Sequence, residues 1–572
     1  MAEIARQRAG QAKRRRLSKL VCGLVAMSAC ISLVDQTADA QPATTDRRPN
    51  IILIVADDLG YSDIGAFGGE ISTPNLDAIA LRGTRALNYY VAPACSPTRA
   101  MLLTGRDNHV AGFGTMPEVA SADQRGAPGY EGYIPKSLPM LAERLSAAGY
   151  VTMMSGKWHL GAGEGQGPSS RGFSKSFALL QGAHNHFGGD QSEEFQRRKI
   201  APQYRLDGAP ASWPSGGYSS QVFADRLIEF LGASDRSKPV FAYLAFTAPH
   251  WPLQARPKTI ARYRGVYDGG PDAIVAARMQ RMADAGLIPR AMRTRALGDA
   301  ARWNALTPEQ RRYEARKMEV YAAMVEEMDT QIGRVLAELR AQGRLDNSYI
   351  IFMSDNGPEG LVFDRIIDPA RPTEPLAIPI DNSVANLGAA NSYFSYGPAW
   401  GQASAAPYWG TKEHTSEGGL RAPLIVAGPG LPSGQIVRDT LHVLDMMPTM
   451  LSMAGTGAVP PGQGVHGIDA LPALKTGPGR RAVARRTIYT ELFYRAAVRS
   501  GNLKAIYQPS RLPIFGPPSK PGEVAWQLFD LATDPGETQD IAGKRRKDLE
   551  RMKADWRRYA KAHGVVLLPE DR

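Results

Sequence analysis

The sequence predicts an α/β fold in which a large, mostly parallel sheet lies between two layers of helices. Three observations predict it: short unbroken apolar runs, helical stripes that alternate with them, and polar residues directly after the runs. An apolar run without alternation is typical of a strand buried on both faces, as in a parallel sheet. Strands that alternate with helices place helices on both faces of the sheet. Beyond about residue 430 the pattern changes, and we expect a smaller α+β subdomain over residues 431–572.

The larger domain begins with its clearest strand, and the other elements follow in order. The apolar runs expected to form strands are 50–56, 151–154, 240–246 and 349–353. Residues 137–148 are expected to form a helix, with Ser137 as its N-cap and Gly149 as its stop. Residues 310–342 carry apolar side chains at spacings of three and four, which is typical of an amphipathic helix packed on a sheet.

Two long segments, 254–306 and 358–410, are rich in loops, although the first is expected to be partly helical. Loops of that length in a compact domain often form lids or substrate walls. In the C-terminal part, residues 526–531 alternate like a strand, and residues 534–537 are typical of a turn. The apolar stripe of a final helix consists of Leu549, Met552, Trp556 and Tyr559.

The first 40 residues have the pattern of a secretory signal peptide. A basic run at 13–16 precedes an apolar stretch at 20–34 and a small-x-small cleavage site at 38–40. That stretch is short for a membrane span, and no other stretch of the sequence is long enough for one. We therefore expect an exported protein, periplasmic or secreted, without a span in its mature chain. Sec export, twin-arginine export and acylation at Cys30 all stay open.

The composition excludes some classes of protein. With 43% hydrophobic and 22% charged residues, the chain is expected to be neither disordered nor repetitive. Its formal net charge of +12 suits an anionic substrate as well as general solubility. Outside the leader, no long basic run is interleaved with aromatic residues, so we expect no nucleic-acid partner.

Polar residues follow the first and last of the expected strands. Asp57 and Asp58 come directly after the run 50–56, and Asp355 and Asn356 come shortly after the run 349–353. In an open α/β sheet the carboxyl ends of the strands form the ligand-binding edge, so these side chains should meet there. Their oxygen atoms favour a hard divalent cation, calcium or magnesium. Capping and turn formation are the alternative for each pair alone.

Basic residues and histidines follow the other expected strands, and one further lysine lies in a loop. Lys157 and His159 stand in GKWHLG at 156–161, His250 in TAPHWP at 247–252, and Lys412 in WGTK at 409–412. Each residue alone is more often structural or solvated than catalytic, but the position of Lys157, His159 and His250 at strand ends indicates one site. His184-Asn185-His186 could belong to a second metal site, although lining the mouth of a pocket, or a plain loop, fits it better.

Cys95 is the remaining cysteine once the leader, with Cys22 and Cys30, is removed. An exported chain with one cysteine has no disulfide, so Cys95 is either an inert core residue or a reactive one. The run CSPTR at 95–99, followed by Thr104-Gly105, resembles the signature of the type I sulfatases of the alkaline phosphatase-like superfamily. Two further runs, TGRDNHVAG at 104–112 and KEHT at 412–415, most resemble those of bacterial arylsulfatases.

The resemblance implies an alkaline phosphatase-like α/β/α sandwich, with a sulfatase catalytic domain over residues 41–430. It implies that a sulfatase-maturating enzyme oxidises Cys95 to formylglycine. One Ca²⁺, with Mg²⁺ as the second choice, would be bound by Asp57, Asp58, Cys95, Asp355 and Asn356. By the same resemblance, Arg99 and Lys157 hold the formylglycine, His159 contacts its hydroxyl, and His250 and Lys412 contact the sulfate.

The implied reaction is hydrolysis of a small sulfate monoester, with an aryl sulfate as the first expectation. One hydroxyl of the hydrated aldehyde attacks sulfur while His250 protonates the leaving oxygen. Deprotonation of the second hydroxyl, with His159 as candidate base, then expels sulfate. The alternatives are a phosphonate monoester or phosphodiester hydrolase with the same nucleophile, and a choline, alkyl or carbohydrate sulfatase. A two-metal phosphatase and a non-catalytic binding protein fit less well, and the oligomeric state stays open.

Overall fold

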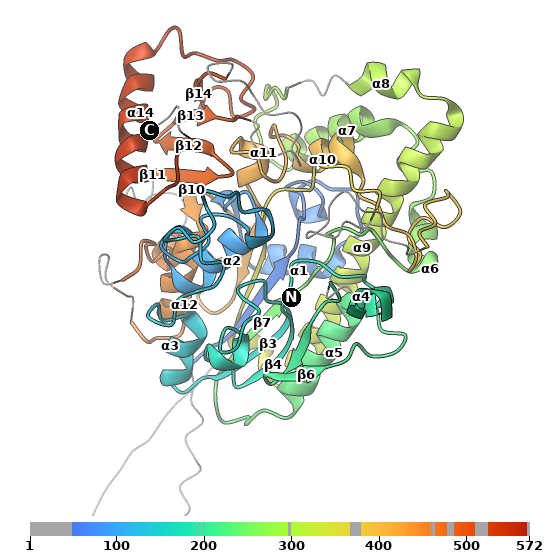
Figure 1. Ribbon diagram of the computed structural model, residues 1–572, viewed down its shortest axis with the longest axis vertical. Coiled ribbons are helices and arrows are strands. Elements are labelled where there is room, and N and C mark those ends of the chain that lie inside the picture. The colour runs from blue at the N-terminus through green and yellow to red at the C-terminus, as the bar shows by residue number, and fades with distance from the viewer. Residues whose placement is uncertain are drawn as a thin grey trace, which may run out of the picture. The chain divides into compact units, whose positions relative to one another are not determined.

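A ten-stranded sheet forms the centre of the structure, which is a computed structural model (Figure 1). The described residues are 48–191, 193–197, 200–295, 299–365, 379–457, 459, 464–476, 486–509 and 524–568. The expected signal peptide, residues 1–40, lies outside them. No helix within these ranges combines the length and the apolar character that crossing a bilayer requires.

The sheet is mixed but mostly parallel, as predicted. In spatial order its strands are β10 (Gln435–His442), β2 (Thr84–Tyr90), β9 (Leu424–Ala427), β8 (Ser348–Ser354), β1 (Asn50–Ala56), β7 (Val240–Ala245), β3 (Val151–Lys157), β4 (Lys175–Leu179), β5 (Tyr204–Leu206) and β6 (Ala209–Ala211). The central strands β8, β1, β7, β3 and β4 are all parallel to their neighbours in that group. Antiparallel pairing joins β9 to its neighbours and brings in β5 and β6.

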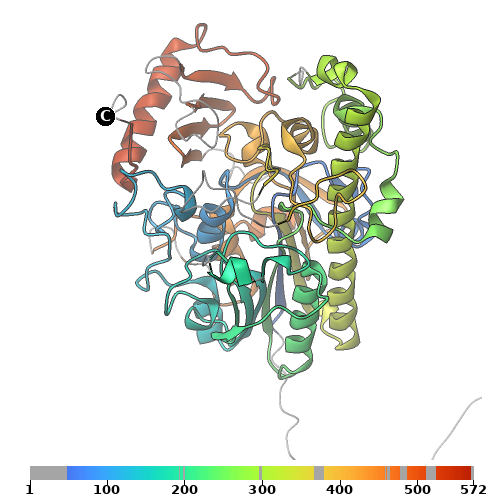
Figure 2. The ribbon, with the colours of Figure 1, turned by 45° about the vertical axis from the view of Figure 1, so that its right-hand side comes forward.

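Helices cover both faces of this sheet, which confirms the predicted three-layer architecture. The helices are α1 (Pro74–Arg82), α2 (Cys95–Thr104), α3 (Leu141–Ala147), α4 (Glu193–Arg197), α5 (Ser219–Gly232), α6 (Pro257–Ile260), α7 (Gly270–Asp284), α8 (Asp299–Ala305), α9 (Pro308–Ala341), α10 (Gly397–Ala405), α11 (Glu417–Leu420), α12 (Met446–Met453), α13 (Leu471–Thr476) and α14 (Arg546–His563). Figure 2 shows the long helix α9 beside α5 on one side of the sheet.

Strand β1 shows why an unbroken apolar run was required at the centre. All seven of its residues are buried. Ile52 and Ile54 pack in the cluster that contains α5 and α9, whereas Ile51 and Leu53 pack in the cluster that contains α2, α3 and α12. Burying each such side chain contributes about 1.5–3 kcal/mol, so both faces of β1 stabilise the layered fold.

Strand β3 extends beyond the run expected at 151–154 and ends at Lys157. Its register with β7 brings Gly156 against Ala245, and a Cβ atom at Gly156 would lie 1.8 Å from the Ala245 carbonyl oxygen. Gly156 therefore permits the close approach of two neighbouring strands. Because this approach continues the strand, Lys157 lies at the sheet edge rather than in a loop.

Two helices differ from their expected bounds at the N-terminal end. The expected helix 137–148 begins only at Leu141, because Pro139 restricts the residue before it to extended backbone. Helix α9 begins two residues earlier than expected, at Pro308. Its N-cap is Thr307, whose side chain accepts a hydrogen bond from the Gln310 backbone in a capping box.

A second, four-stranded antiparallel sheet forms the smaller C-terminal part, in the order β11 (Thr487–Leu492), β12 (Arg495–Ser500), β13 (Leu503–Tyr507) and β14 (Gln527–Asp530). Helix α14 packs on this sheet through the stripe that the sequence predicted. The boundary expected at residue 430 precedes β10, which pairs with β2 in the large sheet. Lys504 on β13 lies 2.7 Å from the buried Glu417 of α11 and ties the smaller sheet to the larger part.

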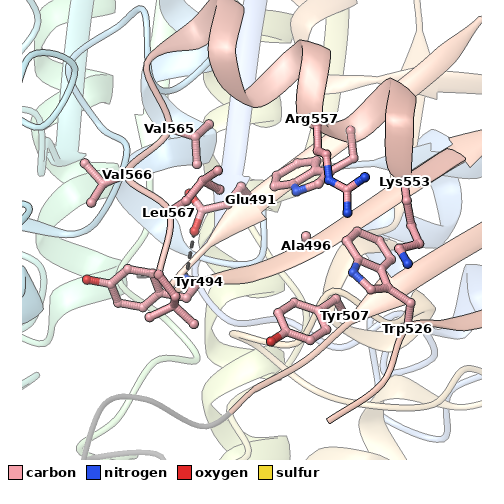
Figure 3. Close-up of a pocket in the computed structure, with 12 residues that line it drawn as sticks. Glu491, Tyr494, Ala496, Tyr507, Trp526, Lys553, Arg557, Val565, Val566 and Leu567 are labelled. Carbon is pink, nitrogen blue, oxygen red and sulfur yellow. Dashed lines mark hydrogen bonds between the residues drawn. The ribbon is translucent and has the colours of Figure 1, made fainter. Parts of the chain in front are cut away.

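A cavity of about 390 Å³ lies between α14 and the smaller sheet (Figure 3). Its lining includes Tyr507, Trp526 and Trp556, with Lys553 and Arg557 from α14. None of the residues that line this cavity belongs to the polar cluster at the edge of the large sheet.

Candidate functional site

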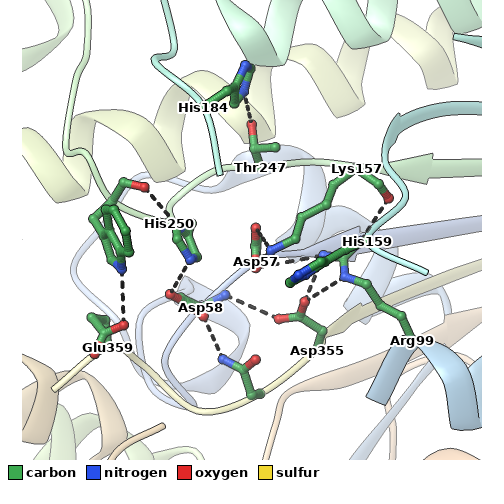
Figure 4. Close-up of polar contacts among 12 residues, drawn as sticks. Asp57, Asp58, Arg99, Lys157, His159, His184, Thr247, His250, Asp355 and Glu359 are labelled. Atoms are coloured by element: carbon green, nitrogen blue, oxygen red, sulfur yellow. Dashed lines mark hydrogen bonds and ion pairs between the residues drawn. The ribbon is translucent and has the colours of Figure 1, made fainter. Parts of the chain in front are cut away.

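Side chains from four strand ends and one helix start meet at the carboxyl edge of the large sheet (Figure 4). Asp57 and Asp58 follow β1, Lys157 ends β3, His250 lies beyond β7, and Asp355 follows β8. Helix α2 begins at Cys95, and Lys412 comes from the loop before α11. The structure thus brings together residues that the sequence separates by hundreds of positions.

Asp57 and Lys157 form the innermost ion pair of the site. Lys157 Nζ lies 2.7 Å from Asp57 Oδ2 and 3.0 Å from Oδ1, and both side chains are fully buried. Burial lowers the pKa of Lys157, but the charge of Asp57 outweighs this effect and raises the pKa above its ordinary value. Lys157 is therefore a permanent cation at the end of β3.

Asp58 is the most connected carboxylate. Its Oδ2 atom lies 3.0 Å from Lys412 Nζ and 3.6 Å from His250 Nε2, and its Oδ1 accepts a 2.7 Å hydrogen bond from Asn356. Burial raises the pKa of Asp58, but the charges of Lys412 and Lys157 and the hydrogen bond from Asn356 lower it to about 2. Its backbone has a φ of 66°, a strained conformation for a non-glycine residue that is typical of functional sites.

Asp355 is held by Arg99, a fully buried arginine on α2. Arg99 Nε and Nη2 lie 2.9 and 2.7 Å from Asp355 Oδ2, and Arg99 also donates to the carbonyl of Lys157 and to the Tyr243 hydroxyl. Burial and the neighbouring charge of Asp57 raise the pKa of Asp355 to about 6. A carboxylate whose negative charge is destabilised in this way is stabilised when a metal cation binds to it.

Cys95 lies at the first position of α2 and is 1% exposed. Burial raises the pKa of its thiol well above the ordinary value, although Lys157 and Lys412 act in the opposite direction. An inaccessible, protonated thiol is a poor nucleophile at neutral pH. The environment therefore does not favour the unmodified cysteine as a thiolate catalyst.

Four potential ligand atoms of Asp57, Asp58, Cys95 and His250 lie within 4.8 Å of one another. The side-chain oxygen of Asn356 is buried beside them without a hydrogen-bond partner in the described part of the chain. Carboxylates and an unpaired amide oxygen form a donor set that suits a hard divalent cation. The residues present therefore fit the metal that the sequence predicted.

His250 is a neutral imidazole, since burial and the nearby Lys412 hold its pKa well below the ordinary value. Its Nδ1 lies 2.6 Å from the carbonyl of Trp251, which leaves Nε2 directed at Asp58. His159 is also buried, and its Nε2 lies 2.9 Å from Glu118. The structure thus links nine of the ten predicted site residues through mutual contacts, whereas His159 contacts a carboxylate outside that set.

The histidines at 184–186 are buried and contact the loop after β7. His184 is buried and lies 2.7 Å from the Tyr204 hydroxyl and 2.8 Å from Thr247. His186 is buried and lies 3.0 Å from the carbonyl of His250. Both rings therefore hold the loop that carries His250 in place.

Sequence reasoning missed Glu359 and Trp251. Glu359 is 2% exposed, and its Oε2 lies 3.3 Å from Lys412 Nζ and 3.2 Å from the indole Nε1 of Trp251. Both residues stand close to predicted ones, since Trp251 follows His250 and Glu359 comes three residues after Asn356. Proximity in sequence was the available signal, but charged and aromatic residues in loops are too common to be selected by it.

Comparisons with known proteins agree with this site. A model of the sulfatase family matches residues 49–456 of the chain. An uncharacterized sulfatase of Schizosaccharomyces pombe is 42% identical over 545 residues, which cover 92% of this chain and 96% of that relative. An arylsulfatase of Klebsiella aerogenes is 40% identical over 435 residues, which cover 75% of this chain and 91% of that relative.

Solved structures show the same fold. The structure of Ps i-CgsB in complex with k-i-k-neocarrahexaose superposes with a TM-score of 0.63 at 25% sequence identity, and the match covers 90% of this chain and 93% of that one. The matched family region begins one residue before β1 and extends past α12, so it contains every strand end that contributes to the site. The chain therefore belongs to the sulfatase family and is an arylsulfatase-like hydrolase.

Proposed function

We propose that this protein hydrolyses sulfate monoesters, with aryl sulfates as its first substrates, through residue 95 as formylglycine and one bound Ca²⁺. The observation that carries the proposal is the convergence of Cys95, Asp57, Asp58 and His250 within 4.8 Å, surrounded by buried cations. The similarity to the Klebsiella arylsulfatase supports the aryl preference.

The metal would be held by Asp57, Asp58, Asp355 and Asn356, together with residue 95, and it would act as a Lewis acid toward the nucleophile and the sulfuryl oxygens. Calcium is proposed over magnesium because it accepts varied arrangements of oxygen ligands, whereas magnesium requires a nearly ideal octahedron. As formylglycine, residue 95 supplies a hydrated aldehyde whose hydroxyl attacks sulfur and whose second hydroxyl allows the sulfate to be released.

The other residues act on charge and protons. Lys157 pairs with Asp57 and Lys412 pairs with Asp58, and both lysines stabilise negative charge on the sulfuryl oxygens. Arg99 holds Asp355 and so orients the start of α2. His250 would donate a proton from Nε2 to the leaving oxygen. Because its Nδ1 hydrogen already serves the Trp251 carbonyl, the ring has to take up a proton first, which the negative charge of a bound sulfate ester favours. His159, fixed by Glu118, is the candidate base for sulfate release.

Maturation would precede folding. Cys95 is 1% exposed at the start of a helix, so a modifying enzyme has no access to its Cβ atom in the folded chain. We propose that the maturating enzyme acts on the unfolded chain, and that a signal peptide over residues 1–40 directs the protein to the periplasm or the exterior.

Two substrates test the proposal. Turnover of para-nitrophenyl sulfate should exceed turnover of a phenyl phosphonate monoester by the same enzyme, and Cys95→Ala should hydrolyse neither. A preference for the phosphonate ester would instead assign the site to phosphonate or phosphodiester hydrolysis. A carbohydrate sulfate is the second candidate substrate, because the similar Ps i-CgsB structure holds a neocarrahexaose.

A further inference from the structure

A stack of aromatic side chains stands beside the proposed general acid. Trp251 follows His250 directly, and their ring centroids lie 4.9 Å apart. Trp251 also stacks on Phe363, with centroids 4.2 Å apart and ring planes inclined by 25°. Both rings are only half-buried, and Tyr393 contacts Trp251 edge-on at 5.8 Å. Half-exposed, stacked aromatic rings next to a buried reaction centre form a ready surface for another flat ring.

Glu359 fixes the orientation of that surface. Its Oε2 accepts a 3.2 Å hydrogen bond from the Trp251 indole, and its Oε1 accepts two 2.8 Å hydrogen bonds from the backbone of Gly360 and Leu361. The same carboxylate lies 3.3 Å from Lys412 Nζ. Glu359 therefore ties the indole to the lysine that faces the sulfate, so the sulfate end and the aromatic surface keep a fixed relation.

We propose that Trp251, oriented by Glu359 and backed by Phe363, is the specificity-determining wall for the leaving group. This inference rests on the proposed sulfatase function. The leaving oxygen must lie within hydrogen-bond distance of His250 Nε2 when that oxygen receives its proton. The group attached to that oxygen then passes beside Trp251, where an aryl ring can pack against the exposed parts of the aromatic rings and a flexible alkyl chain gains little.

The sulfate end and the leaving-group end can be tested separately. Inorganic sulfate has no leaving group, so its inhibition constant reports on the metal and the lysines alone. The tests compare kcat/KM for para-nitrophenyl sulfate and for butyl sulfate with inhibition by inorganic sulfate. The variants are Trp251→Leu, which removes the ring, and Trp251→Phe, which keeps a ring but cannot donate to Glu359. Trp526→Leu, in the cavity of the smaller subdomain, is the matched control.

Trp251→Leu should lower kcat/KM for the aryl sulfate about three- to tenfold, an effect of the size expected for one aromatic stacking partner. The values for butyl sulfate and for inhibition by sulfate should stay within about twofold, and Trp251→Phe should fall between wild type and Trp251→Leu. Phe363→Leu, which alters the second ring without touching His250, should show the same aryl-selective loss. Trp526→Leu should change none of the three values.

An equal loss for aryl and alkyl sulfates in both Trp251→Leu and Phe363→Leu would overturn the inference, because the stack would then serve only the fold. An unchanged aryl preference in both variants would overturn it as well. A wild-type enzyme that hydrolyses neither sulfate would instead overturn the proposed function, and the inference with it.

Discussion

The guanidinium of Arg99 holds a single carboxylate oxygen of Asp355, with Nε at 2.9 Å and Nη2 at 2.7 Å. Both side chains are fully buried. This contact joins the helix that begins at Cys95 to the end of β8, so the residue proposed as nucleophile and a proposed metal ligand have a fixed relation before any substrate binds. Positioning of this kind is what electrostatic catalysis requires of its scaffold.

Arg99→Met should therefore destabilise the protein strongly. Removing one member of a buried ion pair leaves the other charge uncompensated and costs about 3–5 kcal/mol. Urea denaturation measures the loss. Arg82→Met, which removes an exposed pair with Asp346, is the matched control and should cost at most about 1 kcal/mol. Equal losses in the two variants would contradict the structural role of Arg99.

Cys95 should be converted to an aldehyde in protein made by its natural host. The peptide that contains residue 95 should be about 18 Da lighter than its unmodified form, because the oxidation replaces hydrogen sulfide by one oxygen atom. Mass spectrometry reads this directly. Cys95→Ala should lose turnover completely but keep its unfolding midpoint within a few degrees. An unmodified cysteine in active protein would refute the mechanism.

The sequence predicted the elements whose signal is local. The run 50–56 is buried on both faces in the structure, and the aspartates after it lie at the expected sheet edge. Strand β10 could not be predicted as part of the large sheet, because it carries polar residues and is only partly buried. Its place depends on pairing with β2, whose residues lie far away along the chain.

The sequence also predicted only part of the site. Residues at strand ends could be predicted because parallel strands place their carboxyl ends together. Glu359 was missed because its role depends on the spatial neighbours Lys412 and Trp251, which no spacing rule connects to it. The start of α3 was misplaced because Pro139 overrode the capping signal of Ser137.

Chelation should remove both activity and part of the stability. A metal that binds only the folded chain stabilises it by about 2.7 kcal/mol when its concentration is a hundred times its Kd. EGTA should therefore lower the melting temperature, and added calcium should restore it more effectively than magnesium. Asn356→Leu, which removes the unpaired buried amide oxygen, should weaken calcium binding at least about tenfold. Calorimetry measures the calcium affinity of both proteins. An unchanged affinity in Asn356→Leu would show that Asn356 is not a metal ligand.

His250 should matter most for poor leaving groups. A general acid contributes about 10²- to 10⁴-fold when the leaving oxygen is basic, and much less when it is a good leaving group. His250→Ala should therefore steepen the dependence of kcat/KM on the pKa of the leaving phenol across a series of aryl sulfates. His563→Ala on the distant helix α14 should leave that dependence unchanged. If kcat/KM depended equally steeply on the pKa of the leaving phenol in wild type and in His250→Ala, another group would donate the proton.

His109 joins the loop after α2 to the smaller sheet and should stabilise the protein up to high pH. His109 is buried between Asp107 and Glu491 of β11, at 3.2 and 2.8 Å, and Tyr559 of α14 donates a hydrogen bond to Asp107. The Tyr130 ring packs against the imidazole. Burial lowers the pKa of His109, but the hydrogen bonds to the two carboxylates raise it to about 9.

Because the folded pKa lies above the ordinary value of 6.5, this group stabilises the fold fully below about pH 6.5. The contribution should disappear as the pH rises through about 9, and a shift of this size corresponds to about 3 kcal/mol. Urea unfolding of wild type and His109→Gln between these two pH values measures it. The difference in unfolding free energy should shrink with rising pH. A difference that grows instead would mean that His109 is neutral in the folded protein.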